Sequence, residues 1–149
     1  MDSDGGITRT IFMQAVTLTA ANDYTARQID AWAAPEDRPL GEWNRDRLEA
    51  NTLVAVVGGM VMGFTDIRET GYIDMLFVSP RFERRGIGST LLAEAEHRAR
   101  IAEAPLLFSN VSITARPFFE AHGFVTTATQ HPIVRGVPLK NYRMTKRLE

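Results

Sequence analysis

A short segment in the middle of the chain has the residue types and the spacing needed to hold an anion. Two arginines stand beside two glycines that are one residue apart, and two hydroxyl residues follow. Glycines let backbone N–H groups approach a ligand closely, and guanidinium groups pair well with phosphate. The residues expected to contact a phosphate are Arg84, Arg85, Gly86, Ile87, Gly88, Ser89 and Thr90.

The segments on either side of these residues fit that chemistry. A β-branched and aromatic run from Tyr72 to Val78 predicts a buried strand, which Ser79-Pro80 ends. Apolar residues at the spacing of one helix face predict a helix from about Gly88 to Ala102. Because the first turn of a helix favours an anion, the strand, turn and helix together indicate a phosphate site. A strand–turn–helix corner without a ligand is the alternative.

Two common nucleotide-binding motifs are excluded. The chain has no G-x-x-x-x-G-K-[ST] sequence, and the third glycine of the dinucleotide fingerprint would fall on Leu91.

The composition limits the class of protein. The chain has 149 residues, a formal net charge of −1 and no cysteine. We therefore expect a single domain over 1–149, no nucleic-acid or membrane partner, no disulfide and no metal site built on thiolates. No apolar run is long enough to span a membrane, and residues 1–6 are unlike a signal peptide, so a soluble cytoplasmic protein is expected.

The remaining sequence predicts an α+β fold. Helices are expected over 7–18, 25–33, 42–50 and 113–122, and strands over 52–57, 60–67, 106–109, 124–130 and 141–146. Gly58-Gly59 suits a tight hairpin, so the strands between 52 and 78 form an antiparallel meander. A right-handed crossover would place the strand at 106–109 parallel to the strand at 72–78.

Two segments resemble motifs of the GNAT (Gcn5-related) N-acetyltransferases. Residues 73–80, followed by the glycine-rich turn, resemble I-D-x-L-x-V-x-P and Q/R-x-x-G-x-G/A. Residues 112–124 resemble N-x-x-A-x-x-[FL]-Y-x-x-x-G-F, and residues 21–33 are similar to a bacterial subgroup of the family. The departures are Glu83 at the Q/R position, Ser112 in place of asparagine and Phe119 in place of tyrosine.

The resemblance implies a GNAT-like fold and transfer of an acetyl group from acetyl-CoA to a primary amine. It implies a mixed, mostly antiparallel twisted sheet flanked by helices, in which parallel strands around 72–78 and 106–110 splay apart around the cofactor. Backbone groups near Leu76, Phe77 and Val78 would bond the pantetheine arm, which Ser112 and Phe119 would flank. The turn, Arg84 and Arg85 would hold the pyrophosphate.

Two catalytic roles follow for side chains. Asp74 lies among apolar residues, where burial would raise its pKa toward the range of a useful base, so it is the candidate proton acceptor. An aspartate that fixes a loop through hydrogen bonds is the alternative. Because Phe119 replaces the tyrosine that often acts as the family's acid, Tyr142, Tyr72 or water would protonate the thiolate.

Several questions stay open at this level. A non-catalytic acyl-CoA-binding or sensor domain is the alternative function, and a small molecule and a peptide both remain possible acceptors. GNAT domains usually begin with a strand, yet only six polar residues precede Ile7. We therefore expect that strand to be missing and the strand at 52–57 to be an exposed edge, which favours a homodimer or a longer natural start.

Overall fold

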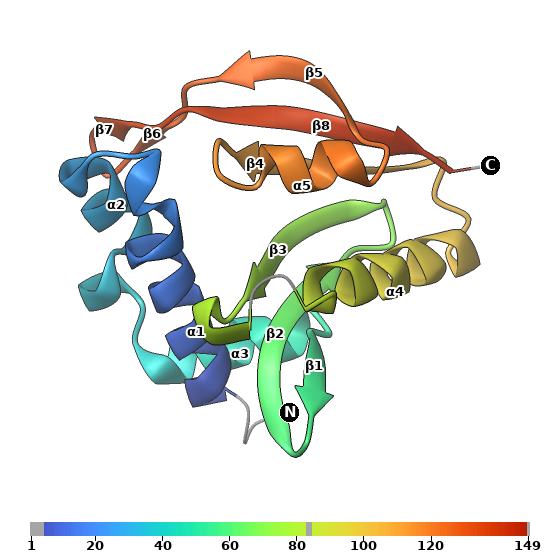
Figure 1. Cartoon of the computed structure of the whole chain (residues 1–149), viewed down its shortest axis with the longest axis horizontal. Coiled ribbons are helices and arrows are strands. Elements are labelled where there is room, and N and C mark those ends of the chain that lie inside the picture. Colours follow the sequence, from blue (N-terminus) through green and yellow to red (C-terminus); the bar gives the residue numbers. More distant parts are fainter. Residues whose placement is uncertain (1–4, 83–84, 149) are drawn as a thin grey trace.

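The computed structural model describes residues 5–82 and 85–148 (Figure 1). The helices are α1 (Gly5–Thr17), η2 (Thr19–Asn22), α2 (Ala26–Ala33), η3 (Pro35–Asp37), α3 (Leu40–Glu49), η4 (Pro80–Phe82), α4 (Ile87–Ile101) and α5 (Arg116–Ala121). The strands are β1 (Leu53–Val57), β2 (Met60–Ile67), β3 (Tyr72–Val78), β4 (Leu106–Ser112), β5 (Val125–Gln130), β6 (Ile133–Val134), β7 (Val137–Pro138) and β8 (Asn141–Arg147).

The main sheet has six strands in the order β1-β2-β3-β4-β8-β5. Its only parallel pair among the described residues is β3 with β4, and the other neighbours are antiparallel. This arrangement confirms the predicted mixed, mostly antiparallel α+β fold. The small hairpin of β6 and β7, which lies within a segment expected to be a loop, was not predicted.

The two parallel strands separate soon after they meet. Their register contains only Tyr72 opposite Phe108 and Ile73 opposite Ser109. Beyond Ile73, β3 leaves β4, and Figure 1 shows the two halves of the sheet diverging from this point. The predicted splay is therefore confirmed, with β4 extending to Ser112 rather than 110.

A bulge in β3 accompanies the separation. The β2–β3 register passes from Thr65 opposite Leu76 to Ile67 opposite Ile73, so β3 carries an extra residue there. Side chains of β2 bond the backbone of Met75: Thr65 Oγ1 donates to its carbonyl at 2.7 Å, and Asp66 Oδ1 accepts from its N–H at 3.1 Å. The bulge is thus fixed by buried polar groups of the neighbouring strand.

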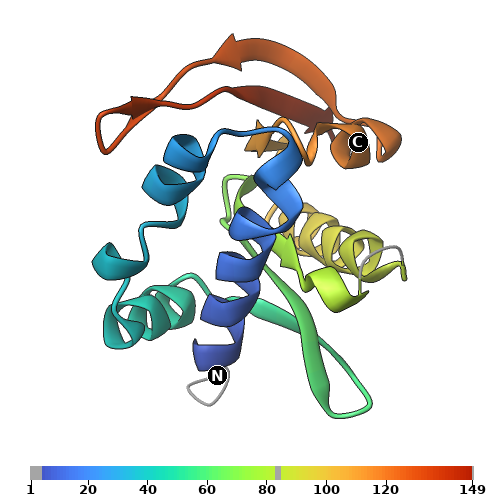
Figure 2. The same cartoon turned by 60° about the vertical axis from the view of Figure 1, so that its left-hand side comes forward.

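Helices cover both faces of the β1–β3 half of the sheet (Figure 2). On one face, α1 and α3 pack Phe12 and Trp43 against Phe64. On the other face, α4 packs Ile87 and Leu91 against the sheet. Residues of β3 alternate between these layers, because successive strand side chains point to opposite faces.

Two predicted helices differ from the structure. The sequence predicts an apolar stripe of Ile7, Ile11, Phe12, Ala15 and Leu18 on the first helix. Ile11 and Phe12 are buried as expected, together with Val16, but Ile7 and Leu18 are 45% and 62% exposed. The helix expected at 113–122 is shortened to α5, because β4 continues through Ser112 and proline occupies the first turn of α5.

The strand β1 forms one edge of the sheet, as expected. Among residues 5–82 and 85–148, no strand pairs with its outer side. The described chain begins directly with α1 at Gly5, so no strand precedes the first helix within the described residues.

Candidate active site

The glycine-rich turn lies at the start of α4, as predicted. Gly86 is the N-cap residue with φ 78° and ψ 7°, and no side chain caps the helix within the described residues. Thr90 donates both its N–H and its hydroxyl to the Gly86 carbonyl, at 3.0 and 2.9 Å. The amides of the first turn are therefore left for a ligand.

Only one of the two predicted arginines can be placed. Arg85 is exposed beside the turn, with its guanidinium carbon 5.6 Å from the ring centroid of Phe82. The predicted contact of Arg84, and the departure at Glu83, lie outside the described residues.

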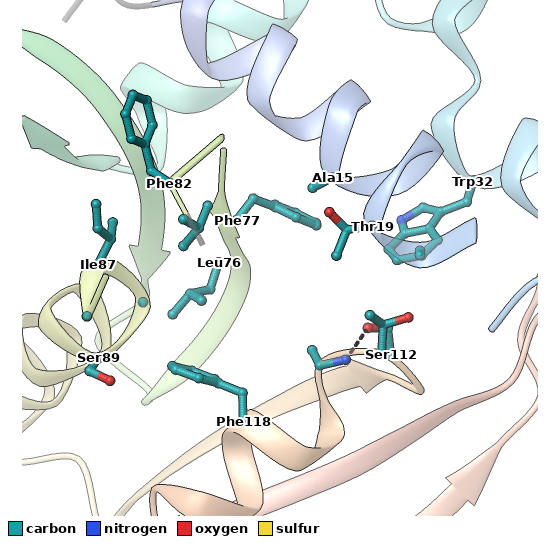
Figure 3. Close-up of a pocket in the computed structure, with 16 residues that line it drawn as sticks. Ala15, Thr19, Trp32, Leu76, Phe77, Phe82, Ile87, Ser89, Ser112 and Phe118 are labelled. Atoms are coloured by element: carbon teal, nitrogen blue, oxygen red, sulfur yellow. Dashed lines mark hydrogen bonds between the residues drawn. The ribbon is translucent and has the colours of Figure 1, made fainter. Parts of the chain in front are cut away.

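A cavity of about 350 Å³ opens between β3, the start of α4, α5 and α1 (Figure 3). Eight of the residues predicted to bind the cofactor line it: Leu76, Phe77, Val78, Gly86, Ile87, Gly88, Ser89 and Ser112. In Figure 3, Leu76 and Phe118 face each other across one part of the cavity, and Trp32 stands at its far side. The lining is mainly apolar, which suits a pantetheine arm.

Gly88 is fitted closely to this cavity. A Cβ atom built on Gly88 would lie 3.1 Å from two ring atoms of Phe118 and 3.7 Å from Val78. A larger residue there would have to displace the Phe118 ring or fill the cavity. The lack of a side chain at Gly88 therefore lets the Phe118 ring pack against the first turn of α4.

Phe118, and not Phe119, is the aromatic residue of α5 that lines the cavity. Phe119 is 3% exposed and packs in the core against Phe124, with ring centroids 5.0 Å apart. The structure therefore places Phe119 in the core, outside the lining of the cavity where it was expected to flank the cofactor, because the turn of α5 directs neighbouring side chains in different directions.

A serine–histidine pair at the cavity was not predicted. Ser89 Oγ and His122 Nε2 are 2.8 Å apart, and His122 Nδ1 is 2.8 Å from the carbonyl oxygen of Phe118. A carbonyl only accepts, so Nδ1 carries a proton, and Nε2 is left to share a hydrogen bond with the Ser89 hydroxyl. Residues so far apart in the sequence give no local signal of this contact.

A second cavity of about 220 Å³ adjoins the first. Trp32, Phe77 and Ser112 line both cavities, so the two meet where β3 and β4 separate. Asp74 lines the second cavity, together with residues of the β6–β7 hairpin region. Of these two cavities Asp74 lines only the second, whereas Trp32, Phe77 and Ser112 lie where the two meet.

The surroundings of Asp74 differ from those expected. Its side chain is exposed rather than enclosed by apolar residues, because the bulge of β3 displaces the simple alternation of the strand. Its Oδ1 accepts a long hydrogen bond of 3.4 Å from the hydroxyl of Tyr72. Burial, and then the negative charge of Asp74, raise the pKa of Tyr72 above its usual value.

Tyr142 lies in the core rather than in either cavity. It is 7% exposed, and the guanidinium carbon of Arg116 stands 4.2 Å from its ring centroid. Tyr142 is absent from the described residues that line the two cavities. A direct role as proton donor is therefore not favoured by its position.

Tyr24 was expected from the sequence either to contact an acceptor amine through its ring or to pack in the core, and the structure shows that its hydroxyl also ties together the segments around the site. Its hydroxyl donates to the Lys140 carbonyl at 2.6 Å and accepts from the Ile113 N–H at 2.9 Å. The bonds join the segment before α2 to the end of β4 and the start of β8. Burial raises the pKa of Tyr24, so its hydroxyl stays protonated as both bonds require.

Other site types find no support in the described part of the chain. Residues 5–82 and 85–148 contain no group of three His, Cys, Asp or Glu side chains placed to hold a metal ion. Within the same ranges, no helix combines the length and apolar content needed to cross a membrane.

Comparison with known proteins identifies the family. Residues 20–146 match the model of the acetyltransferase (GNAT) domain. The chain therefore belongs to the GNAT family, as the motifs predicted, and it is an N-acetyltransferase with acetyl-CoA as its acyl donor.

Individual relatives agree with this assignment. The uncharacterised N-acetyltransferase YafP of Escherichia coli K12 is 38% identical over 134 residues, which cover 90% of this chain and 83% of YafP. A GCN5-related N-acetyltransferase from Rhodopseudomonas palustris has a TM-score of 0.94 and 30% identity, covering 99% of this chain and 92% of that one. PaiA N-acetyltransferase from Thermoplasma acidophilum, solved with coenzyme A, shares the fold with a TM-score of 0.76, 19% identity and coverage of 99% and 94%.

Proposed function

We propose that this chain transfers the acetyl group of acetyl-CoA to the primary amine of a small acceptor by direct attack on the thioester. The observation that carries the proposal is the pair of adjoining cavities at the splay of β3 and β4, which share Trp32, Phe77 and Ser112. One cavity begins at an anion-binding helix terminus and the other contains a carboxylate. This arrangement brings an acyl donor and an amine together from opposite sides.

The first cavity holds the donor. Arg85 and the amides at the start of α4 bind the pyrophosphate, and Arg84, next in the chain, is expected to add a second positive charge. Beyond Ile73, the side of β3 that faces β4 has no strand partner among the described residues, so its backbone groups bond the pantetheine arm. A strand N–H polarises the thioester carbonyl.

The reaction removes two protons from the ammonium nitrogen and returns one to the thiolate. Asp74 takes the first proton from the ammonium group, directly or through a water, and the neutral nitrogen then attacks the carbonyl carbon. The C–N bond forms, water takes the second proton from the nitrogen, and the C–S bond breaks with its electron pair leaving on the sulfur of CoA. Thiols have a pKa near 8.5, so the thiolate leaves readily, and Tyr72 or water suffices to protonate it.

Thiol release from acetyl-CoA in the presence of a panel of primary amines tests the reaction, and calorimetry with CoA tests the donor site. In Gly88→Val the new side chain meets Phe118 and displaces either this ring or the turn. CoA affinity should then fall on the order of 10- to 100-fold, the effect expected if one charge-assisted hydrogen bond to the pyrophosphate is lost.

Gly41→Val is the matched control. A Cβ at Gly41 meets nothing within 4 Å, so this variant should bind CoA normally. Unchanged CoA affinity in Gly88→Val would move the donor site away from this turn.

A further inference from the structure

The second cavity is lined by charges of both signs. Asp74 comes from β3, Arg38 from the segment between η3 and α3, and Lys140 from the segment before β8. No ion pair within the described residues involves any of the three. Opposite charges that share a small cavity without pairing leave room for a ligand that pairs with both.

Arg38 is held ready to bind an anion. Its Nε donates to the Ala33 carbonyl at 2.8 Å and its Nη2 to the Trp32 carbonyl at 2.9 Å, while its guanidinium carbon stands 4.5 Å from the ring centroid of Phe12. Its Nη1 has no acceptor in the described part of the chain. A half-buried guanidinium fixed in this way loses little further conformational entropy when it binds an anion.

The charges around Arg38 are mostly positive. Arg9 donates to backbone carbonyls, whereas Arg47 pairs with Asp66 and Arg135 pairs with Asp37. Burial, followed by the charges of Arg135, Arg47 and Arg9, lowers the pKa of Arg38, and Asp74 opposes this effect. A bound anion would relieve the same repulsion.

The second cavity is small and has a carboxylate at the end opposite its positive charges. The volume of about 220 Å³ lies below the range that holds drug-sized ligands. Asp74 is the one carboxylate among the described residues that line the cavity, and within the described chain its side chain accepts only the long hydrogen bond from Tyr72. An ammonium group therefore has one natural partner at this end.

Resting on the proposed function, we infer that the acceptor is a small amine that also carries a carboxylate, of the amino-acid type. Its amine lies beside Asp74, and its carboxylate pairs with Arg38 and Lys140. A polyamine fits less well, because its second cation would meet these two positive side chains.

A matched substrate series tests the inference. For each of several side chains, the amino acid, its carboxamide and the amine that lacks the carboxyl group are compared by thiol release. We expect kcat/KM for the amino acids to be about 10- to 100-fold higher, the value of one charge-assisted pair. Equal or better transfer to the simple amines would overturn the inference and leave the proposed function intact. No transfer to any amine would overturn both.

Charge variants give the second readout. Lys140→Gln and Arg38→Gln should raise KM for amino acids about 10-fold or more, with KM for the carboxamides and for acetyl-CoA unchanged. Arg38 also donates to the last carbonyls of α2, so Arg38→Gln can unfold the chain. In that case Lys140→Gln alone tests the carboxylate site, because the Lys140 side chain is exposed.

Arg27→Gln is the control for net charge. Arg27 is exposed on α2 and does not line the second cavity. It should leave KM for the amino acids unchanged. A Lys140→Gln variant with normal KM for the amino acids would contradict the assigned carboxylate site.

Discussion

Asp74 supplies the carboxylate of the second cavity, and its exposure sets how it can act. An exposed carboxylate exchanges protons with solvent quickly and can accept one from a substrate through a bridging water. The Asp74→Asn variant keeps the shape of the side chain but cannot take the proton. We expect its transfer rate to fall about 10²- to 10⁴-fold, while calorimetry shows normal CoA binding.

Glu69→Gln is the matched control for Asp74→Asn. Glu69 is an exposed carboxylate in the turn before β3 and does not line the second cavity. Its variant should transfer acetyl groups normally. Near-normal turnover in Asp74→Asn would assign proton removal to solvent or to another group, and loss of CoA binding would make Asp74 structural.

Residue patterns predicted the turn of the proposed donor site more directly than the proposed catalytic groups. The turn at 86–89 stands out because a backbone that would approach a phosphate closely needs glycine, and this need is visible in the sequence. The partner of Ser89 was not found, because His122 is distant in the chain. The burial of Phe119 was missed for a related reason: which of two adjacent rings faces a cavity depends on how α5 packs.

At the scale of elements, strand and helix order followed from the sequence, whereas the bulge in β3 did not. Alternation along Tyr72, Asp74 and Leu76 predicted a common face, but the extra residue changes the direction of the strand at Asp74. The bulge depends on Asp66, a residue of another strand that is 2% exposed and bonds the Met75 N–H. A local pattern cannot show such a long-range requirement.

Asp66 also pairs with Arg47, so its removal should weaken this part of the fold. Asp66 Oδ2 lies 2.5 Å from Arg47 Nη1. Asp66→Ala leaves the Arg47 guanidinium and the Met75 N–H buried without the oxygens that accept from them, and we expect the free energy of unfolding at pH 7 to fall by about 3–5 kcal/mol. Chemical denaturation measures this change.

The same pair predicts a dependence on pH. Burial raises the pKa of Asp66, more than the charge of Arg47 lowers it. A carboxyl whose pKa is raised in the folded state adds stability below its unfolded pKa and loses this contribution as the pH rises through the folded value. Between pH 7 and about pH 4, the stability of the parent chain should therefore rise relative to Asp66→Ala as the pH falls. A difference that shrinks as the pH falls would show that Arg47 outweighs burial.

At the scale of the whole molecule, the sheet has two edge strands, β1 and β5, and exposed apolar residues lie beside β1. The β5 edge belongs to the half that contains β4 and β8, and the opposite edge is β1. Exposed apolar residues gather at the β1–β2 hairpin, where Val56 is 53% exposed, Val57 56% and Met60 46%. An exposed edge with apolar side chains is a template for pairing with another chain.

We therefore expect the protein to form a homodimer in which β1 pairs with β1 of a second copy. Val56→Lys places like charges near each other across such a pairing. The dimer dissociation constant should therefore rise about tenfold or more, which corresponds to about 1.4 kcal/mol.

Ile101→Lys, at a 69% exposed residue that ends α4, is the control and should leave the dimer unchanged. Sedimentation velocity over a range of concentrations measures both, and transfer activity should persist in both variants because β2 separates β1 from the cavity-lining β3. A parent chain that stays monomeric at every concentration would rule out this pairing, and a dimer that Val56→Lys does not weaken would place the contact on another surface.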